Sequence, residues 1–156
     1  ANLNAPEQLV VSGDTAAVER VRELALAAGA RRAVALAVSG AFHSPLMAPA
    51  AERLRQLLAH TALAAARVPV LANVSACPTT EPQQIRRNLV DQLTAPVRWV
   101  DTIRQLARLG VTAAFEVGPG DVLKGLVRRI EPGITVTPVG TAEQLAQAVA
   151  GLKGST

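Results

Sequence analysis

The chain has 156 residues, of which 49% are hydrophobic and 18% charged, a composition typical of a folded domain and not of a disordered one. Aromatic residues make up only 2%, which argues against a protein that stacks single-stranded nucleic acid on aromatic side chains. One cysteine, Cys77, excludes an intramolecular disulfide and a zinc site built from several cysteines. No apolar run approaches the roughly 20 residues that span a bilayer, and no signal-peptide pattern opens the sequence, so we expect a cytoplasmic protein without a membrane partner.

The charge balance is weakly basic, with 16 Lys and Arg against 12 Asp and Glu, a net charge of +4. The arginines are scattered or stand in short pairs, at residues 31–32, 86–87 and 128–129. Such a distribution is typical of solvated helix faces. An acidic protein or a phosphate-bearing substrate remains the alternative partner, and no nucleic-acid partner is expected.

The first half of the chain alternates short apolar runs with helical patterns. A strand is expected over residues 8–12, followed by a helix over 15–28 with Asp14 as its N-cap. A buried type of strand is expected over 33–38 (AVALAV), then a loop. The pair Ser44-Pro45 marks the start of a helix that runs to His60.

The second half continues the alternation. Strands are expected over 68–72, 112–117 and 134–139, and helices over 83–93, 97–109, 122–130 and 142–152, with Asp121 and Thr141 as caps of the last two. Strands that alternate with helices predict an α/β fold with largely parallel strand pairing. The opening ANLNAPEQL has neither a start methionine nor the composition of a disordered tail, so we expect a processed, cut or split polypeptide.

Two histidines are candidates for chemistry. His60 stands at a predicted helix end, where an imidazolium is favoured by the helix dipole, so we interpret it as structural. His43 lies in the loop after a predicted strand, where α/β proteins place reactive groups, but the sequence shows no recognisable nucleophile motif or orienting residue for it. Metal-ligand spacings are missing, so no metal site is expected, and Cys77 has no histidine near it in sequence.

The turn Gly118-Pro119-Gly120 follows a strand and opens a helix, which is the setting of a dinucleotide-binding loop. The third glycine of that pattern is replaced by Leu123, so the turn is interpreted as a tight turn at an anion-tolerant helix N-terminus. A G-x-S-x-G nucleophile elbow occurs nowhere in the sequence.

Four stretches, however, occur in an order that resembles a known family: SGAFHSPLM (39–47), VPVLANVSA (68–76), QLTAPVRW (92–99) and EVGPGDVLKGL (116–126). Together with the opening NAPEQLVVSG (4–13), they resemble the C-terminal half of malonyl-CoA:acyl-carrier-protein transacylases of fatty-acid synthesis. The resemblance covers essentially the whole chain.

The resemblance implies a role for several residues. His43 matches the family's general base, which acts on a serine that carries the malonyl group between coenzyme A and the phosphopantetheine thiol of acyl-carrier protein. Gln92 matches the residue whose main-chain carbonyl orients that histidine. Phe42 and Asn4 match substrate-binding positions, Phe42 by narrowing the pocket and Asn4 by facing the cleft. Asn73 is a candidate supporting residue without an assigned role.

The family's serine, its carboxylate-binding arginine and its oxyanion hole belong to an N-terminal half that this sequence lacks. The resemblance therefore implies a complementary N-terminal half as partner, besides acyl-carrier protein and a coenzyme A thioester, and inactivity of this chain alone. No cofactor is expected, because the phosphopantetheine is carried by the partner. The implied fold is α/β: residues 1–38 form the latter part of a small ferredoxin-like subdomain, and residues 39–156 the C-terminal part of a large, hydrolase-like parallel-sheet subdomain.

Three alternatives stay open. The chain could be a non-catalytic remnant that binds acyl-carrier protein through its arginines. It could supply malonyl groups to polyketide synthesis, which uses related transferases. An unrelated nucleotide-binding α/β domain would need a phosphate loop that the sequence does not convincingly contain.

Overall fold

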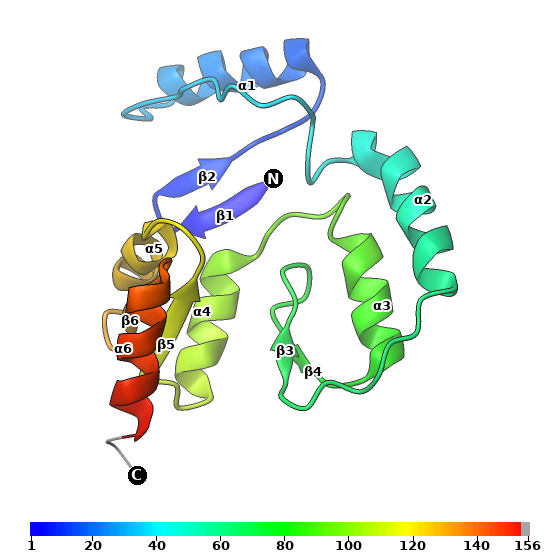
Figure 1. Ribbon diagram of the computed structural model, residues 1–156. Helices are drawn as coiled ribbons and strands as arrows, with labels where there is room; N and C mark the ends of the chain where they lie inside the picture. The colour runs from blue at the N-terminus through cyan, green and yellow to red at the C-terminus, as the bar shows by residue number, and fades with distance from the viewer. Residues whose placement is uncertain (154–156) are drawn as a thin grey trace. The chain divides into compact units, whose positions relative to one another are not determined.

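A computed structural model describes residues 1–153 of the chain (Figure 1). Its contacts divide the chain into two units: an N-terminal unit of Ala1–Asn4 and Gln8–Trp99, and a C-terminal unit of Ala5–Glu7 and the chain from Val100 onward. The fold is mixed α/β, as the sequence predicts. The ferredoxin-like assignment and the expected boundary between residues 38 and 39 stay predictions.

The N-terminal unit begins with two short paired strands, β1 (Asn2–Ala5) and β2 (Gln8–Val10). Helix α1 (Thr15–Ala27) follows, and the carboxylate of Asp14 caps it by accepting hydrogen bonds from the amides of Ala16 and Ala17 at 3.0 and 3.3 Å. The predicted cap is therefore confirmed. The predicted strand over 8–12 is confirmed in its first three residues, whereas β1 was missed because it is too short to show alternation.

The predicted strand over residues 33–38 is wrong: this segment forms no strand in the structure. Its apolar side chains are exposed, with Val34 at 63%, Leu36 at 58% and Val38 at 65%. A strand requires a neighbour that satisfies its backbone hydrogen bonds, and within residues 1–153 none pairs with this segment. The apolar composition of this run is typical of a buried segment, but the described residues do not cover it.

The helix expected from Pro45 to His60 is present in two pieces, the 3₁₀ helix η1 (Pro45–Met47) and the α-helix α2 (Ala48–Ala59). Ser44 caps η1, as expected, by accepting a hydrogen bond from the Leu46 amide at 3.3 Å. The short strands β3 (Val70–Leu71) and β4 (Pro78–Thr79) then form an antiparallel pair, and α3 (Pro82–Asp91) packs against α2.

The C-terminal unit is built on two parallel strands, β5 (Ala113–Val117) and β6 (Thr135–Val139). Helices α5 (Val122–Ile130) and α6 (Ala142–Lys153) both contact β6 (Figure 1). Helix α4 (Trp99–Arg108) precedes β5 in the chain. The buried apolar residues of this unit include Ile103 of α4, Leu126 and Val127 of α5, and Ile134, Val136 and Val139 in and beside β6.

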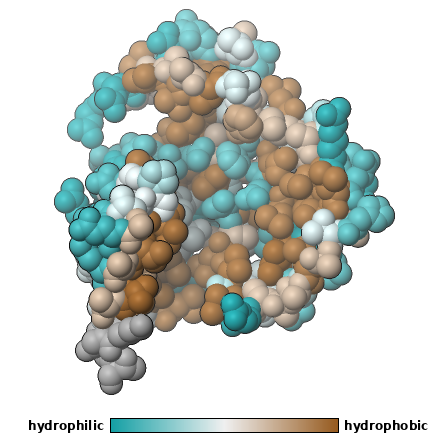
Figure 2. All heavy atoms as spheres, in the orientation of Figure 1, coloured by the Kyte–Doolittle hydropathy of each residue, from teal (hydrophilic) through white to brown (hydrophobic). Residues whose placement is uncertain are grey.

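Much apolar surface is nevertheless exposed, and Figure 2 shows it as brown atoms around α1 and around α2. Helix α1 has no buried residue, and Val117 at the end of β5 is 83% exposed. Monomeric proteins rarely leave large contiguous apolar patches in water. Among residues 1–153, no helix is both long and apolar enough to cross a membrane.

Candidate active site

His43 has an unusual backbone conformation. It lies in the loop that leads into η1, with φ at +60°, in the left-handed region. For a residue other than glycine this conformation costs about 1–2 kcal/mol. Such strain persists only where the surroundings hold it, and it concentrates at functional sites.

The ring of His43 is held by the chain at Gln92. Its Nδ1 atom lies 2.8 Å from the main-chain oxygen of Gln92, the residue at which α3 ends. The last carbonyls of a helix have no partner within the helix, so this oxygen is available to the ring. Since a carbonyl can only accept, Nδ1 carries the proton of the neutral ring and the lone pair is left on Nε2. The structure thus brings together the two residues that were predicted to be catalytic.

The side chain of Gln92 is fixed separately from its carbonyl. The Asn73 amide, which follows β3, donates a hydrogen bond to Oε1 of Gln92 at 3.3 Å, and the main-chain oxygen of Asn73 accepts one from the Arg98 amide at 2.9 Å. Asn73, which the sequence singled out without a role, therefore contacts the residue that orients His43.

Two serine hydroxyls hold the backbone just before His43. The Ser12 hydroxyl donates to the main-chain oxygen of Phe42 at 2.5 Å, and the Ser44 hydroxyl donates to the main-chain oxygen of Ala41 at 2.7 Å. Ser44 is 3% exposed. Its cap pattern was visible in the sequence, whereas Ser12 lies 30 residues from its partner and no local pattern could have found it.

The two residues predicted to bind substrate are less constrained. Phe42 adjoins His43 and is 50% exposed, and a Cβ atom placed on Gly40 would lie 3.3 Å from its ring. Gly40 therefore leaves the room that this ring needs. Asn4 is half-buried on β1, and among the described residues no hydrogen bond joins it to His43 or Gln92. The roles of both residues stay predictions.

The turn Gly118-Pro119-Gly120 does not present a free helix N-terminus. The carboxylate of Glu116, 9% exposed, accepts hydrogen bonds from the amides of Leu123 and Lys124 in the first turn of α5, both at 2.8 Å. These amides are the groups that a phosphate-binding loop would offer. The expected cap residue, Asp121, is at the N-cap position but its side chain makes no capping bond. That detail of the sequence interpretation is wrong, because Glu116 fills the place.

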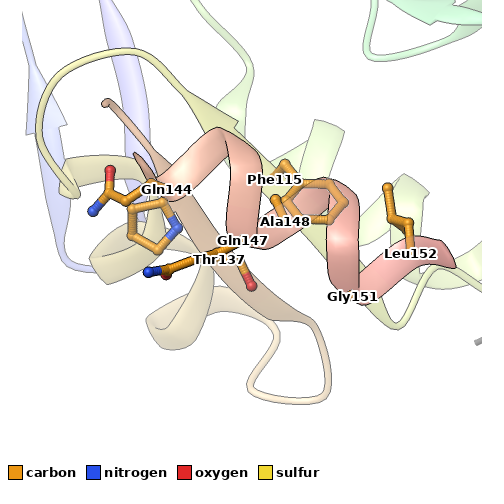
Figure 3. Close-up of a pocket in the computed structure, with 8 residues that line it drawn as sticks. Phe115, Thr137, Gln144, Gln147, Ala148, Gly151 and Leu152 are labelled. Atoms are coloured by element: carbon orange, nitrogen blue, oxygen red, sulfur yellow. The ribbon is translucent and has the colours of Figure 1, made fainter. Parts of the chain in front are cut away.

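The C-terminal unit contains a hollow of about 430 Å³ between β5, β6 and α6 (Figure 3). Phe115, Thr137, Gln144 and Gln147 are among its lining residues, and no charged side chain of the described chain lines it. No group of three or more potential metal ligands occurs within residues 1–153. The hollow has no titratable group to carry chemistry, so the geometry around His43 remains the candidate active site.

Comparison with known proteins identifies the family of this chain. A family model described as an acyl transferase domain matches residues 1–149. The malonyl CoA-acyl carrier protein transacylase of Bacillus subtilis (strain 168) is 45% identical over 153 residues, which are 98% of this chain and 48% of that protein. The chain thus spans about half the length of the curated relatives it matches.

Solved structures give the same relationship. The malonyl-CoA:acyl carrier protein transacylase of Xanthomonas oryzae pv. oryzae superposes with a TM-score of 0.90 at 41% identity, over 97% of this chain and 48% of that one. A malonyl-transacylase in complex with its type II PKS acyl-carrier protein superposes with a TM-score of 0.92 at 38% identity, over 97% of this chain and 49% of that one. The chain belongs to the acyl transferase family, and malonyl-CoA:acyl-carrier-protein transacylases are its relatives.

Proposed function

We propose that this chain is the histidine-bearing half of a malonyl-CoA:acyl-carrier-protein transacylase, and that His43 is its general base. The observation that carries the proposal is the 2.8 Å contact between Nδ1 of His43 and the main-chain oxygen of Gln92. In the neutral ring this contact leaves the lone pair on Nε2, which is the tautomer that a general base requires.

The proposed reaction has two half-reactions. A serine hydroxyl attacks the thioester carbonyl of malonyl-CoA while Nε2 of His43 takes its proton. The carbon–sulfur bond then breaks, and the proton passes from Nε2 to the sulfur of coenzyme A. In the second half, Nε2 takes the proton of the phosphopantetheine thiol, the sulfur attacks the malonyl-serine ester, and the serine oxygen recovers the proton as it leaves.

The nucleophile of this proposal comes from outside the chain. The sequence has no G-x-S-x-G elbow, and the chain spans 48% of its Bacillus subtilis relative. We assign the serine, the oxyanion hole and the arginine that pairs with the malonyl carboxylate to a complementary N-terminal half. The exposed apolar residues 33–38 and Val117 suit such a partner, because its association would bury them.

Substrate selection is proposed to involve the residue next to the base. Phe42 is half-exposed, and its ring would narrow the space beside His43. Asn4 is proposed to face the bound acyl group from β1. The acceptor is acyl-carrier protein, as in the neighbouring complex structure. The same transfer would serve fatty-acid or polyketide synthesis, and it needs no cofactor beyond the two thioester carriers.

Reconstitution tests this proposal. The chain is assayed for malonyl transfer from malonyl-CoA to acyl-carrier protein, alone and co-expressed with the N-terminal half of the Bacillus subtilis relative. Transfer is expected only with both halves. His43→Ala should lower it by about 10²–10⁴-fold, the usual share of a general base, whereas His60→Ala, at the exposed end of α2, should not change it.

Two results would overturn the proposal. Robust turnover by the chain alone would place the nucleophile within it. Persistent binding of acyl-carrier protein, without transfer in the presence of any N-terminal half, would instead identify a non-catalytic binding remnant.

A further inference from the structure

The inference concerns the peptide that precedes His43, and it rests on the proposed role of His43 as the base. The angle φ of His43 describes rotation about its N–Cα bond. That rotation moves the peptide plane containing the Phe42 carbonyl relative to the imidazole ring. At +60° this angle lies in a region that L residues rarely adopt, so the free loop would relax toward a negative value.

Two contacts oppose that relaxation, one on each side of the rotating bond. On the ring side, Nδ1 of His43 lies 2.8 Å from the Gln92 carbonyl. On the peptide side, the Ser12 hydroxyl donates to the Phe42 carbonyl at 2.5 Å. If only the ring were held, the Phe42–His43 peptide could still turn about the N–Cα bond, and φ could relax.

Ser12 is placed to act from outside the loop. It follows β2 and precedes Asp14, the cap of α1, 30 residues away from Phe42 in the chain. The other hydroxyl, that of Ser44, holds the neighbouring Ala41 carbonyl at 2.7 Å but belongs to the loop itself. Ser12 therefore anchors the peptide side of the loop to the segment between β2 and α1, as Gln92 anchors the ring side.

We propose that Ser12 is a positioning residue for catalysis. It holds the Phe42–His43 peptide so that His43 keeps its left-handed backbone and its Nε2 atom stays directed at the nucleophilic serine of the complementary half. Ser12 acts through His43 and touches neither substrate nor reacting atoms. Its loss should lower kcat and leave the binding of malonyl-CoA unchanged, because misplacing a base weakens the chemical step.

The test uses the reconstituted enzyme, made of this chain and the complementary half. Ser12→Ala is expected to lower kcat about fivefold to tenfold, the effect of one hydrogen bond, with KM for malonyl-CoA unchanged within twofold. Ser12→Cys keeps the volume but donates weakly, and should lose about as much as Ser12→Ala. Ser12→Thr retains the hydroxyl and should recover at least half of the wild-type kcat.

The matched control is Ser39→Ala, an exposed serine of the same loop, which should keep the wild-type kcat. A second readout does not depend on activity: the ¹⁵N shifts of the His43 ring report which nitrogen carries the proton. In the wild type Nδ1 should be protonated, and Ser12→Ala should raise the population protonated on Nε2.

The outcomes separate this inference from the proposed function. If His43→Ala lowers transfer but Ser12→Ala retains kcat within twofold, the positioning role is overturned and the base remains. A loss in Ser12→Ala that Ser12→Thr does not restore also overturns it, since the hydroxyl is then not responsible. If His43→Ala leaves transfer intact, the proposed function itself fails.

Discussion

The Nδ1 atom of His43 lies 2.8 Å from the main-chain oxygen of Gln92, so the group that orients the imidazole is a peptide carbonyl and not an acidic side chain. A carbonyl fixes the tautomer as an aspartate would, but it adds no negative charge beside the imidazolium that the proposed proton transfer would form. Because this carbonyl belongs to the main chain, it remains in place when the side chain of Gln92 is substituted.

Gln92→Ala should be a mild substitution. The carbonyl that holds His43 remains, and the side chain loses the bond that Oε1 accepts from Asn73 and a long one, 3.4 Å, that Nε2 donates to the main-chain oxygen of Leu89. We expect kcat of the reconstituted enzyme to fall less than about tenfold, because one such bond contributes about 1 kcal/mol. The same measurement on His43→Ala should show a far larger loss.

Asn73→Ala provides the control for this interpretation. It removes the other partner of the bond between the two side chains and leaves the bond from Gln92 to Leu89, so its effect should be no larger than that of Gln92→Ala, and the double variant should be no worse than Gln92→Ala alone. Additive losses in the double variant would mean that the two side chains act independently.

Glu116→Ala should destabilise the C-terminal unit. The substitution leaves the amides of Leu123 and Lys124 without their acceptor at the start of α5. We expect the free energy of unfolding to fall by about 2–3 kcal/mol, because the two hydrogen bonds are accepted by a carboxylate of a residue that is only 9% exposed. Urea unfolding of the assembled protein measures it.

Asp121→Ala is the matched control, because the Asp121 side chain makes no capping bond although it stands at the N-cap position. Its effect should stay below about 0.5 kcal/mol. A larger loss from Asp121→Ala than from Glu116→Ala would contradict the assignment of Glu116 as the cap.

Gly140→Ala should also be destabilising, for a steric reason. A Cβ atom at this position would lie 2.7 Å from the Gly118 oxygen and 3.2 Å from Cα of Pro119, which are backbone atoms that cannot turn away. We expect a loss of about 1–3 kcal/mol in the free energy of unfolding. Thermal unfolding of the assembled protein provides the measurement.

Gly125→Ala is the comparison for Gly140. Gly125 lies inside α5 and has no atom within 4 Å of the added Cβ. Alanine is the better helix former, so this variant should be about 0.5–1 kcal/mol more stable. Equal destabilisation by the two substitutions would show that the approach of Gly118 to Gly140 is not tight.

The sequence predicted well what depends on local chemistry. The side chains of Asp14 and Ser44 cap helices where expected, because a cap is a contact with the next two or three residues. The parallel pair of β5 and β6 follows from two apolar runs separated by a helix. The pairing of His43 with Gln92 was reached through family resemblance, since periodicity cannot reveal a contact across 49 residues.

Long-range contacts explain the misses. The run over residues 33–38 has the composition of a strand, but composition cannot supply a neighbour, and among residues 1–153 none pairs with it. Ser12 meets Phe42 only through the fold. Glu116, not Asp121, accepts the hydrogen bonds at the start of α5, and it does so from the preceding strand. A search for capping residues directly before the helix does not consider this position.

The most direct test of the central claim, that this chain supplies the base and its partner the nucleophile, is intact-mass measurement after brief exposure of the reconstituted enzyme to malonyl-CoA. We expect a malonyl adduct on the complementary half and none on this chain, and His43→Ala should slow its formation by about 10²–10⁴-fold. An adduct on this chain, on Cys77 or on any hydroxyl, would contradict it.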